Sequence, residues 1–66
     1  MKLAENLKTL RTLYKLTQKD LAEKLKIYPS NISDWENCVS RPEYEHLVAL
    51  ADIFNVTVGQ LLGVED

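Results

Sequence analysis

Residues 17–37 read TQKDLAEKL, then KIY, then PSNISDWEN. Two short helical patterns flank the corner at KIY, which is the layout of a helix-turn-helix. Ile32 and Trp35 lie three positions apart, so they predict the buried side of the second of these helices. The opposite side remains free to face a partner, which we expect to be a DNA major groove, and carries Pro29, Ser30, Asn31 and Asp34.

The bounds of both helices follow from local signals. Thr17 is a suitable N-cap, and Asp20, three residues later, can return a hydrogen bond as in a capping box. Pro29 fits the first turn of the next helix, where a backbone N–H lacks a partner anyway. That helix should begin near Tyr28 and end near Asn37. The corner residue Lys26 is predicted to adopt a left-handed conformation, which a residue with a side chain resists.

Three further helices are predicted around this pair. Leu3, Leu7, Leu10 and Tyr14 form an apolar stripe that runs through about residue 15, and Leu13 is expected to broaden it. A fourth helix is predicted from the spacing of apolar residues between 47 and 54, with Asn55 as its C-terminal stop.

A second capping box, Thr57 with Gln60, opens a short fifth helix that Gly63 ends. No strand pattern competes. We therefore expect an all-α, compact five-helix bundle built as one domain over residues 1–66.

Composition limits the possible functions. The 66 residues carry a net charge of −2, which is unusual for a nucleic-acid binder. However, seven of the eight basic residues fall in the first 26 positions, while Glu65 and Asp66 help to make the far end acidic. This asymmetry indicates one basic, DNA-facing surface. No apolar run is long enough to cross a membrane and no export leader opens the chain, so we expect a cytoplasmic protein.

Catalytic and metal-binding residues are scarce. Cys38 and His46 are the single cysteine and the single histidine, which is too few for a zinc site or an internal disulfide. No third group accompanies them to orient a nucleophile and its base. There is also no glycine-rich phosphate loop and no organised pair of carboxylates. We expect neither an enzyme nor a metal or cofactor.

Several ordered pieces resemble a known family: Leu10-Arg11, Leu16-Thr17-Gln18, Asp20-Leu21-Ala22, residues 32–37, residues 54–58, and Leu61-Leu62. Together, over nearly the whole chain, they are similar to the DNA-binding domain of phage-repressor and Cro-type regulators, the XRE-like helix-turn-helix family. The resemblance implies a five-helix bundle of the lambda-repressor-like type whose third helix enters the major groove. It also implies a homodimer that binds a paired operator in double-stranded DNA.

Position by position, the resemblance assigns roles to individual residues. The base-edge contacts fall on Pro29, Ser30 and Asp34. Phosphate contacts fall on Gln18, Asn31 and Asn37. An ion pair between the first and third helices falls on Arg11 and Glu36.

The third helix has no arginine, glutamine or asparagine fork at the base-edge positions to read guanine or adenine. Three sources of specificity therefore stay open. Asp34 can accept from a cytosine amine, Pro29 can touch a thymine methyl group, and DNA shape can contribute.

Other contacts follow from the residues themselves. Gln18 lies at the positive end of its helix, and Lys19, like Lys15, is a further phosphate candidate. Tyr28 is either a backbone contact or a packing residue, and Arg41 in the connector is either a phosphate contact or a surface charge. Ser30 and Asn31 alternatively cap their own helix.

Two function classes remain. The leading one is a sequence-specific transcriptional regulator, expected to be a repressor, with two copies reading half-sites about 34 Å apart. The expected pairing surface comprises residues around Val56, Val58, Leu61, Leu62 and Val64. The alternative is an antitoxin-like or adaptor module that binds a protein, which the net acidity favours.

Overall fold

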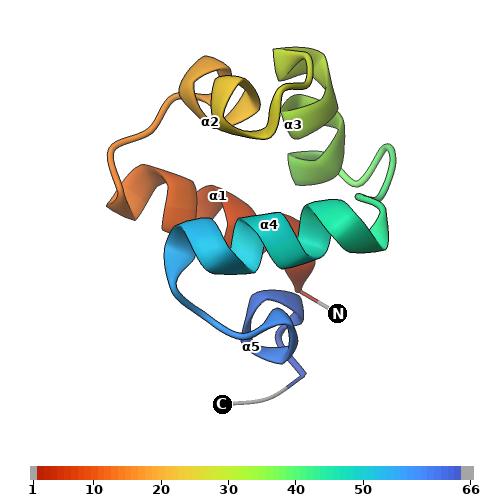
Figure 1. Cartoon of the computed structure of the whole chain (residues 1–66). Helices are drawn as coiled ribbons and strands as arrows, with labels where there is room; N and C mark the ends of the chain where they lie inside the picture. Colours follow the sequence, from red (N-terminus) through yellow and green to blue (C-terminus); the bar gives the residue numbers. More distant parts are fainter. Residues whose placement is uncertain (1, 65–66) are drawn as a thin grey trace.

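The computed structural model describes residues 2–64, so the acidic Glu65 and Asp66 lie outside the described residues. All regular structure in this range is helical (Figure 1). The helices in chain order are α1 (Leu3–Leu13), α2 (Gln18–Leu25), α3 (Pro29–Glu36), α4 (Tyr44–Phe54) and α5 (Val58–Leu62). The expectation of a small all-helical bundle is confirmed.

Both predicted capping boxes are present. Thr17 Oγ1 accepts from the Asp20 backbone N–H at 3.0 Å, and Asp20 Oδ2 accepts from the Thr17 N–H at 2.9 Å. Thr57 and Gln60 repeat this arrangement at the start of α5, with both distances 2.9 Å. Each box occupies two of the N–H groups that a helix N-terminus leaves without partners. The helices therefore begin where local chemistry predicts.

Three helices end in left-handed residues. Lys26 closes α2 with φ of 59°, as predicted, and Asn55 and Gly63 close α4 and α5 with φ of 54° and 77°. The Lys26 N–H donates to the Glu23 carbonyl at 3.3 Å, so this conformation completes the last turn of the helix.

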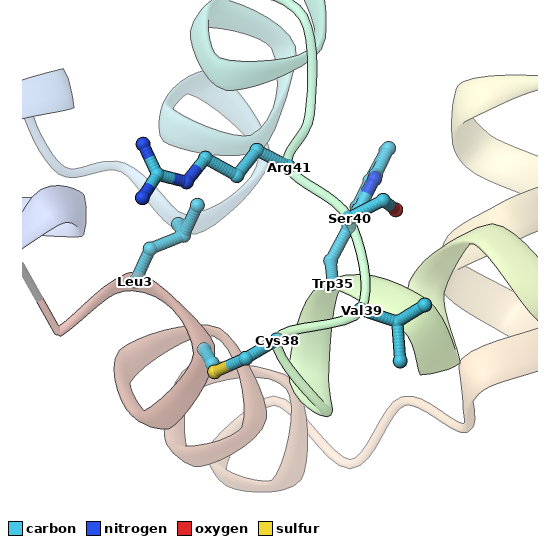
Figure 2. Close-up of a pocket in the computed structure, with 7 residues that line it drawn as sticks. Leu3, Trp35, Cys38, Val39, Ser40 and Arg41 are labelled. Atoms are coloured by element: carbon cyan, nitrogen blue, oxygen red, sulfur yellow. The ribbon is translucent and has the colours of Figure 1, made fainter.

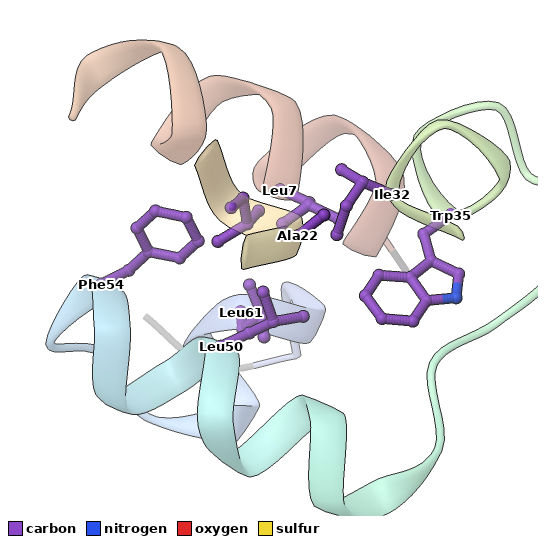
Figure 3. Close-up of a cluster of buried hydrophobic side chains, with 8 residues drawn as sticks. Leu7, Ala22, Ile32, Trp35, Leu50, Phe54 and Leu61 are labelled. Atoms are coloured by element: carbon purple, nitrogen blue, oxygen red, sulfur yellow. The ribbon is translucent and has the colours of Figure 1, made fainter. Parts of the chain in front are cut away.

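The helices pack around one apolar core. α2 and α3 lie together on one side of α1 and α4, and α5 lies on the other side (Figure 1). The core side chains come from all five helices and comprise Leu7, Leu21, Ala22, Ile32, Trp35, Leu50, Phe54 and Leu61 (Figure 3). α3 supplies Ile32 and Trp35 to this core, so the core fixes the rotation of α3 about the helix axis.

The expectation for the end of the first helix was wrong in detail. α1 ends at Leu13, the Leu13 side chain is 71% exposed, and Lys15 enters a left-handed turn with φ of 58°. Leu13 lies about 240° around the helix from Leu7, so it points past the edge of the apolar stripe. Tyr14 remains anchored, because its hydroxyl donates to the Phe54 carbonyl at 2.9 Å.

Candidate nucleic-acid interface

The rotation of α3 decides which of its side chains face outward. Ile32 is fully buried and Trp35 is only 6% exposed, and Figure 3 shows both directed into the core. Successive residues of a helix are rotated by about 100°, so Ser30 and Asp34 lie roughly opposite Ile32. Ser30 is exposed and Asp34 is half-buried. Trp35 also packs against His46 of α4, with ring centroids 5.5 Å apart.

Arg11 and Glu36 form an ion pair that joins α1 to the last turn of α3. Arg11 Nε donates to Glu36 Oε2 at 2.7 Å and Nη2 donates to Oε1 at 3.1 Å. A third donor, Nη1, reaches the Leu16 carbonyl at 2.8 Å. The hydrogen bond to Glu36 raises the pKa of the Arg11 guanidinium. The Glu36 side chain is only 4% exposed, so its charge is compensated inside the protein rather than presented to a partner.

Gln18 belongs to the same network. Its Nε2 donates to Glu36 Oε1 at 3.2 Å, which directs the amide toward α3. The phosphate contact assigned to Gln18 can then use the backbone N–H at the start of α2, where the helix dipole is positive. The sequence contained no local signal for the Gln18–Glu36 bond, because the two residues are 18 positions apart.

The start of α3 faces the turn between α1 and α2. An open hollow there brings the predicted contact residues Gln18, Lys19 and Pro29 together with Lys15. The two ammonium groups and the α2 N-terminus give this hollow a positive potential. Pro29 therefore lies beside the phosphate candidates, rather than opposite the core with Ser30 and Asp34.

Tyr28 precedes α3 and its side chain is 78% exposed, so it is not a packing residue. Asn31 is half-buried on the same helix. No side chain caps α3, and in residues 2–64 neither Ser30 nor Asn31 forms a side-chain hydrogen bond. The alternative in which these two residues cap their own helix is therefore wrong.

Asn37 and Arg41 lie beyond the other end of α3. Asn37 Nδ2 donates to Ser33 Oγ at 3.2 Å, and its side chain is exposed. Arg41 is exposed in the connector to α4 and lines a second hollow of about 280 Å³ with Leu3, Trp35 and Cys38 (Figure 2). The structure therefore does not bring Arg41 together with Lys19. Any DNA contact by Arg41 is separate from the contacts at the start of α3.

Two kinds of feature are absent from residues 2–64. No group of three or more histidine, cysteine, aspartate or glutamate side chains is placed to hold a metal ion. None of the helices is long and apolar enough to span a bilayer.

Comparison with known proteins gives consistent matches. A family model described as Helix-turn-helix matches residues 7–61. The chain is 39% identical over 66 residues to the HTH-type transcriptional activator BcrR of Enterococcus faecalis, covering all of this chain and 32% of that protein. It is 36% identical over 66 residues to the HTH-type transcriptional regulator ImmR of Bacillus subtilis (strain 168). This match covers all of the present chain and 52% of ImmR.

A third relative is YobD of Bacillus subtilis (strain 168), named as an uncharacterized HTH-type transcriptional regulator. It is 37% identical over 62 residues, covering 94% of this chain and 55% of YobD. The chain therefore spans between about a third and just over half of the length of these relatives.

Proposed function

The chain belongs to the helix-turn-helix family, and on that premise we propose that it is a transcriptional regulator that binds double-stranded DNA. In this proposal α3 enters the major groove and α2 lies across the phosphate backbone. The observation that carries the proposal is the orientation of α3. The inner side of α3 is fixed by the buried Ile32 and Trp35 and by the Arg11–Glu36 ion pair. Ser30 and Asp34 therefore face outward.

We propose the roles that the family resemblance implies, with Pro29 at the edge of the reading face beside the phosphate candidates. Base-edge contacts fall to Pro29, Ser30 and Asp34. Phosphate contacts fall to Gln18, Lys19, Tyr28, Asn31, Asn37 and Arg41. Two features support the phosphate assignment: the positive hollow at the start of α2, and the exposure of Tyr28 and Arg41 at opposite ends of α3.

We propose that two copies bind one operator, because a single domain buries little surface on DNA and pairing doubles the contacts. The pairing surface expected from the sequence needs one correction. Leu61 is fully buried in the core, so it cannot contact a second copy, whereas Val64, three positions later in the sequence, is 65% exposed. Analytical ultracentrifugation of the free and DNA-bound protein tests the dimer, and a monomer in both states at high concentration would remove it.

We propose repression as the mode of regulation. Occupying an operator is sufficient to block transcription, whereas activation needs an additional favourable contact with the polymerase. The relative BcrR is named as an activator, so the choice between repression and activation requires its own test. A reporter gene placed behind the selected operator should fall in expression when the protein is supplied. The same proposal places the protein in the cytoplasm, and it requires no catalysis.

A protein-binding adaptor is the competing function. Two observations favour it: the net charge is −2, and α3 (Pro29–Glu36) contains no lysine or arginine. The two functions differ in their dependence on salt. A DNA complex with several phosphate contacts should weaken by orders of magnitude between about 50 and 200 mM salt. A complex with a protein partner need not respond as steeply.

The deciding experiment is selection of binding sites from a random duplex library, followed by fluorescence anisotropy on the selected duplex. We expect enrichment of a motif with two half-sites. Ser30→Glu adds a negative charge to the outward face of α3, so it should abolish binding while the fold is retained. Thr9→Glu adds the same charge at an exposed position of α1, beside Leu13, and should bind nearly as well as the unmodified chain. Failure to enrich any motif favours the adaptor.

A further inference from the structure

Asp34 combines a fixed backbone with a free carboxylate. Its backbone carbonyl accepts from the Val39 N–H at 2.8 Å and from the Ser40 N–H at 3.4 Å, so the chain around it is held in place. Its side chain makes no hydrogen bond or ion pair with any residue in 2–64. The carboxylate is thus available on the outward side of α3 without internal compensation.

The neighbouring outward side chains are less selective. The Ser30 hydroxyl both donates and accepts, so it tolerates several base edges. Asn37 has its amide nitrogen engaged by Ser33 Oγ at 3.2 Å. An ionised carboxylate only accepts, which makes Asp34 the group on this face with the narrowest preference.

The major groove contains few groups that suit such an acceptor. Guanine presents N7 and O6, which repel a carboxylate, and thymine presents O4 and a methyl group. Adenine offers its N6 amine directly beside the N7 acceptor. Cytosine offers its N4 amine with no acceptor of its own beside it in the groove. Cytosine is therefore the base that an uncompensated carboxylate selects.

We propose that Asp34 is a specificity-determining residue that accepts a hydrogen bond from the N4 amine of one cytosine in each half-site; this rests on the proposed function. Of the three sources of specificity that the sequence left open, this contact is the hydrogen bond from a cytosine amine to Asp34. At a site without that cytosine, the carboxylate loses water and gains no donor while it remains close to phosphates. Asp34 therefore discriminates against wrong sites as well as for the right one.

Selection of sites with paired variants tests the assignment. The unmodified chain should enrich cytosine at one position of each half-site. Asp34→Asn should shift that position toward adenine, because an asparagine amide matches adenine N6 and N7. Asp34→Ala should lose preference at that position alone. If both variants enrich the same motif as the unmodified chain, the assignment of Asp34 is overturned while DNA binding stands. If no protein enriches a motif, the proposed function fails as well.

Deleting a single amine from the DNA gives an independent test. Replacing the selected cytosine by 2-pyrimidinone removes the N4 amine. The unmodified chain should lose about tenfold in affinity, and Asp34→Ala should lose almost none. Equal losses for both proteins would overturn the contact. Thermal unfolding provides the control for folding: Asp34→Ala should melt close to the unmodified chain, because the carboxylate has no partner in residues 2–64.

Discussion

Arg11 Nε and Glu36 Oε2 lie 2.7 Å apart and join α1 to the end of α3. Glu36 also accepts from Gln18 at 3.2 Å, so one carboxylate connects three helices. This carboxylate lies beside the core residues that rotate α3. These contacts at Glu36 help to orient α3, which is the helix proposed to read DNA.

Arg11→Ala should destabilise the fold, because it leaves Glu36 nearly buried without a cation. We expect the free energy of unfolding to fall by about 3 kcal/mol, measured by urea denaturation. Lys8→Ala removes an exposed charge from the same helix and should change the free energy of unfolding by less than about 0.5 kcal/mol. If the two variants unfold alike and Arg11→Ala binds DNA normally, the pair does not orient α3.

Tyr14→Phe should remove one hydrogen bond and retain the ring contact. The Tyr14 hydroxyl donates to the Phe54 carbonyl at 2.9 Å, and the two rings meet edge to face with centroids 5.2 Å apart. Loss of the hydroxyl is expected to lower the free energy of unfolding by about 1 kcal/mol. Tyr28→Phe is the matched control, because Tyr28 is exposed, and it should leave stability unchanged. Equal stability of both variants would contradict the bond.

Lys26→Gly should maintain or increase stability. Lys26 has φ of 59°, a conformation that is unfavourable for a residue with a side chain by about 1 to 2 kcal/mol. The greater freedom of glycine in the unfolded chain offsets part of this gain, which leaves a net increase of roughly 0 to 1 kcal/mol. Lys24→Gly, inside α2, should instead lose about 1 kcal/mol. Thermal melts of both variants check the contrast, and a destabilised Lys26→Gly would contradict it.

Stability should depend on pH through Asp20. Hydrogen bonds from the Thr17 backbone and side chain lower the pKa of the Asp20 carboxyl. Because the pKa in the folded state is the lower one, this contribution is complete above the unfolded-state pKa of about 4. It is lost as pH falls through the folded-state pKa.

Unfolding followed from pH 7 down to about pH 3 should therefore show a smaller decline for Asp20→Asn than for the unmodified chain. Asp52→Asn is the control, since the Asp52 carboxylate is exposed and makes no side-chain bond in residues 2–64. It should follow the unmodified chain. Identical declines for all three proteins would exclude a role for Asp20.

Lys19→Ala should weaken DNA binding on all sequences alike. Because Lys19 lies beside the α2 N-terminus, the slope of log affinity against log salt should become shallower by about 1. Lys8→Ala is the control, because Lys8 lines a different hollow with Thr9 and Leu13. If Lys8→Ala and Lys19→Ala change the slope equally, the attraction comes from net charge and not from a placed contact.

Signals that act over a few residues were sufficient to predict much of this fold. Thr17 with Asp20, Thr57 with Gln60, and Pro29 each mark a helix start, because a capping hydrogen bond or a fixed φ involves only neighbouring residues. The apolar spacing of Ile32 and Trp35 likewise predicts the buried side of α3.

Other features depend on residues that are far apart in the chain. The bond from Gln18 to Glu36 and the left-handed turn at Lys15 have no local signal. The sequence alone therefore determined where the helices begin and which side of α3 is apolar, because those properties are local. Only the tertiary structure decided that the Asp34 carboxylate stays free while the Glu36 carboxylate also accepts from Gln18, because each outcome depends on which distant groups the packing of the helices brings within hydrogen-bond reach.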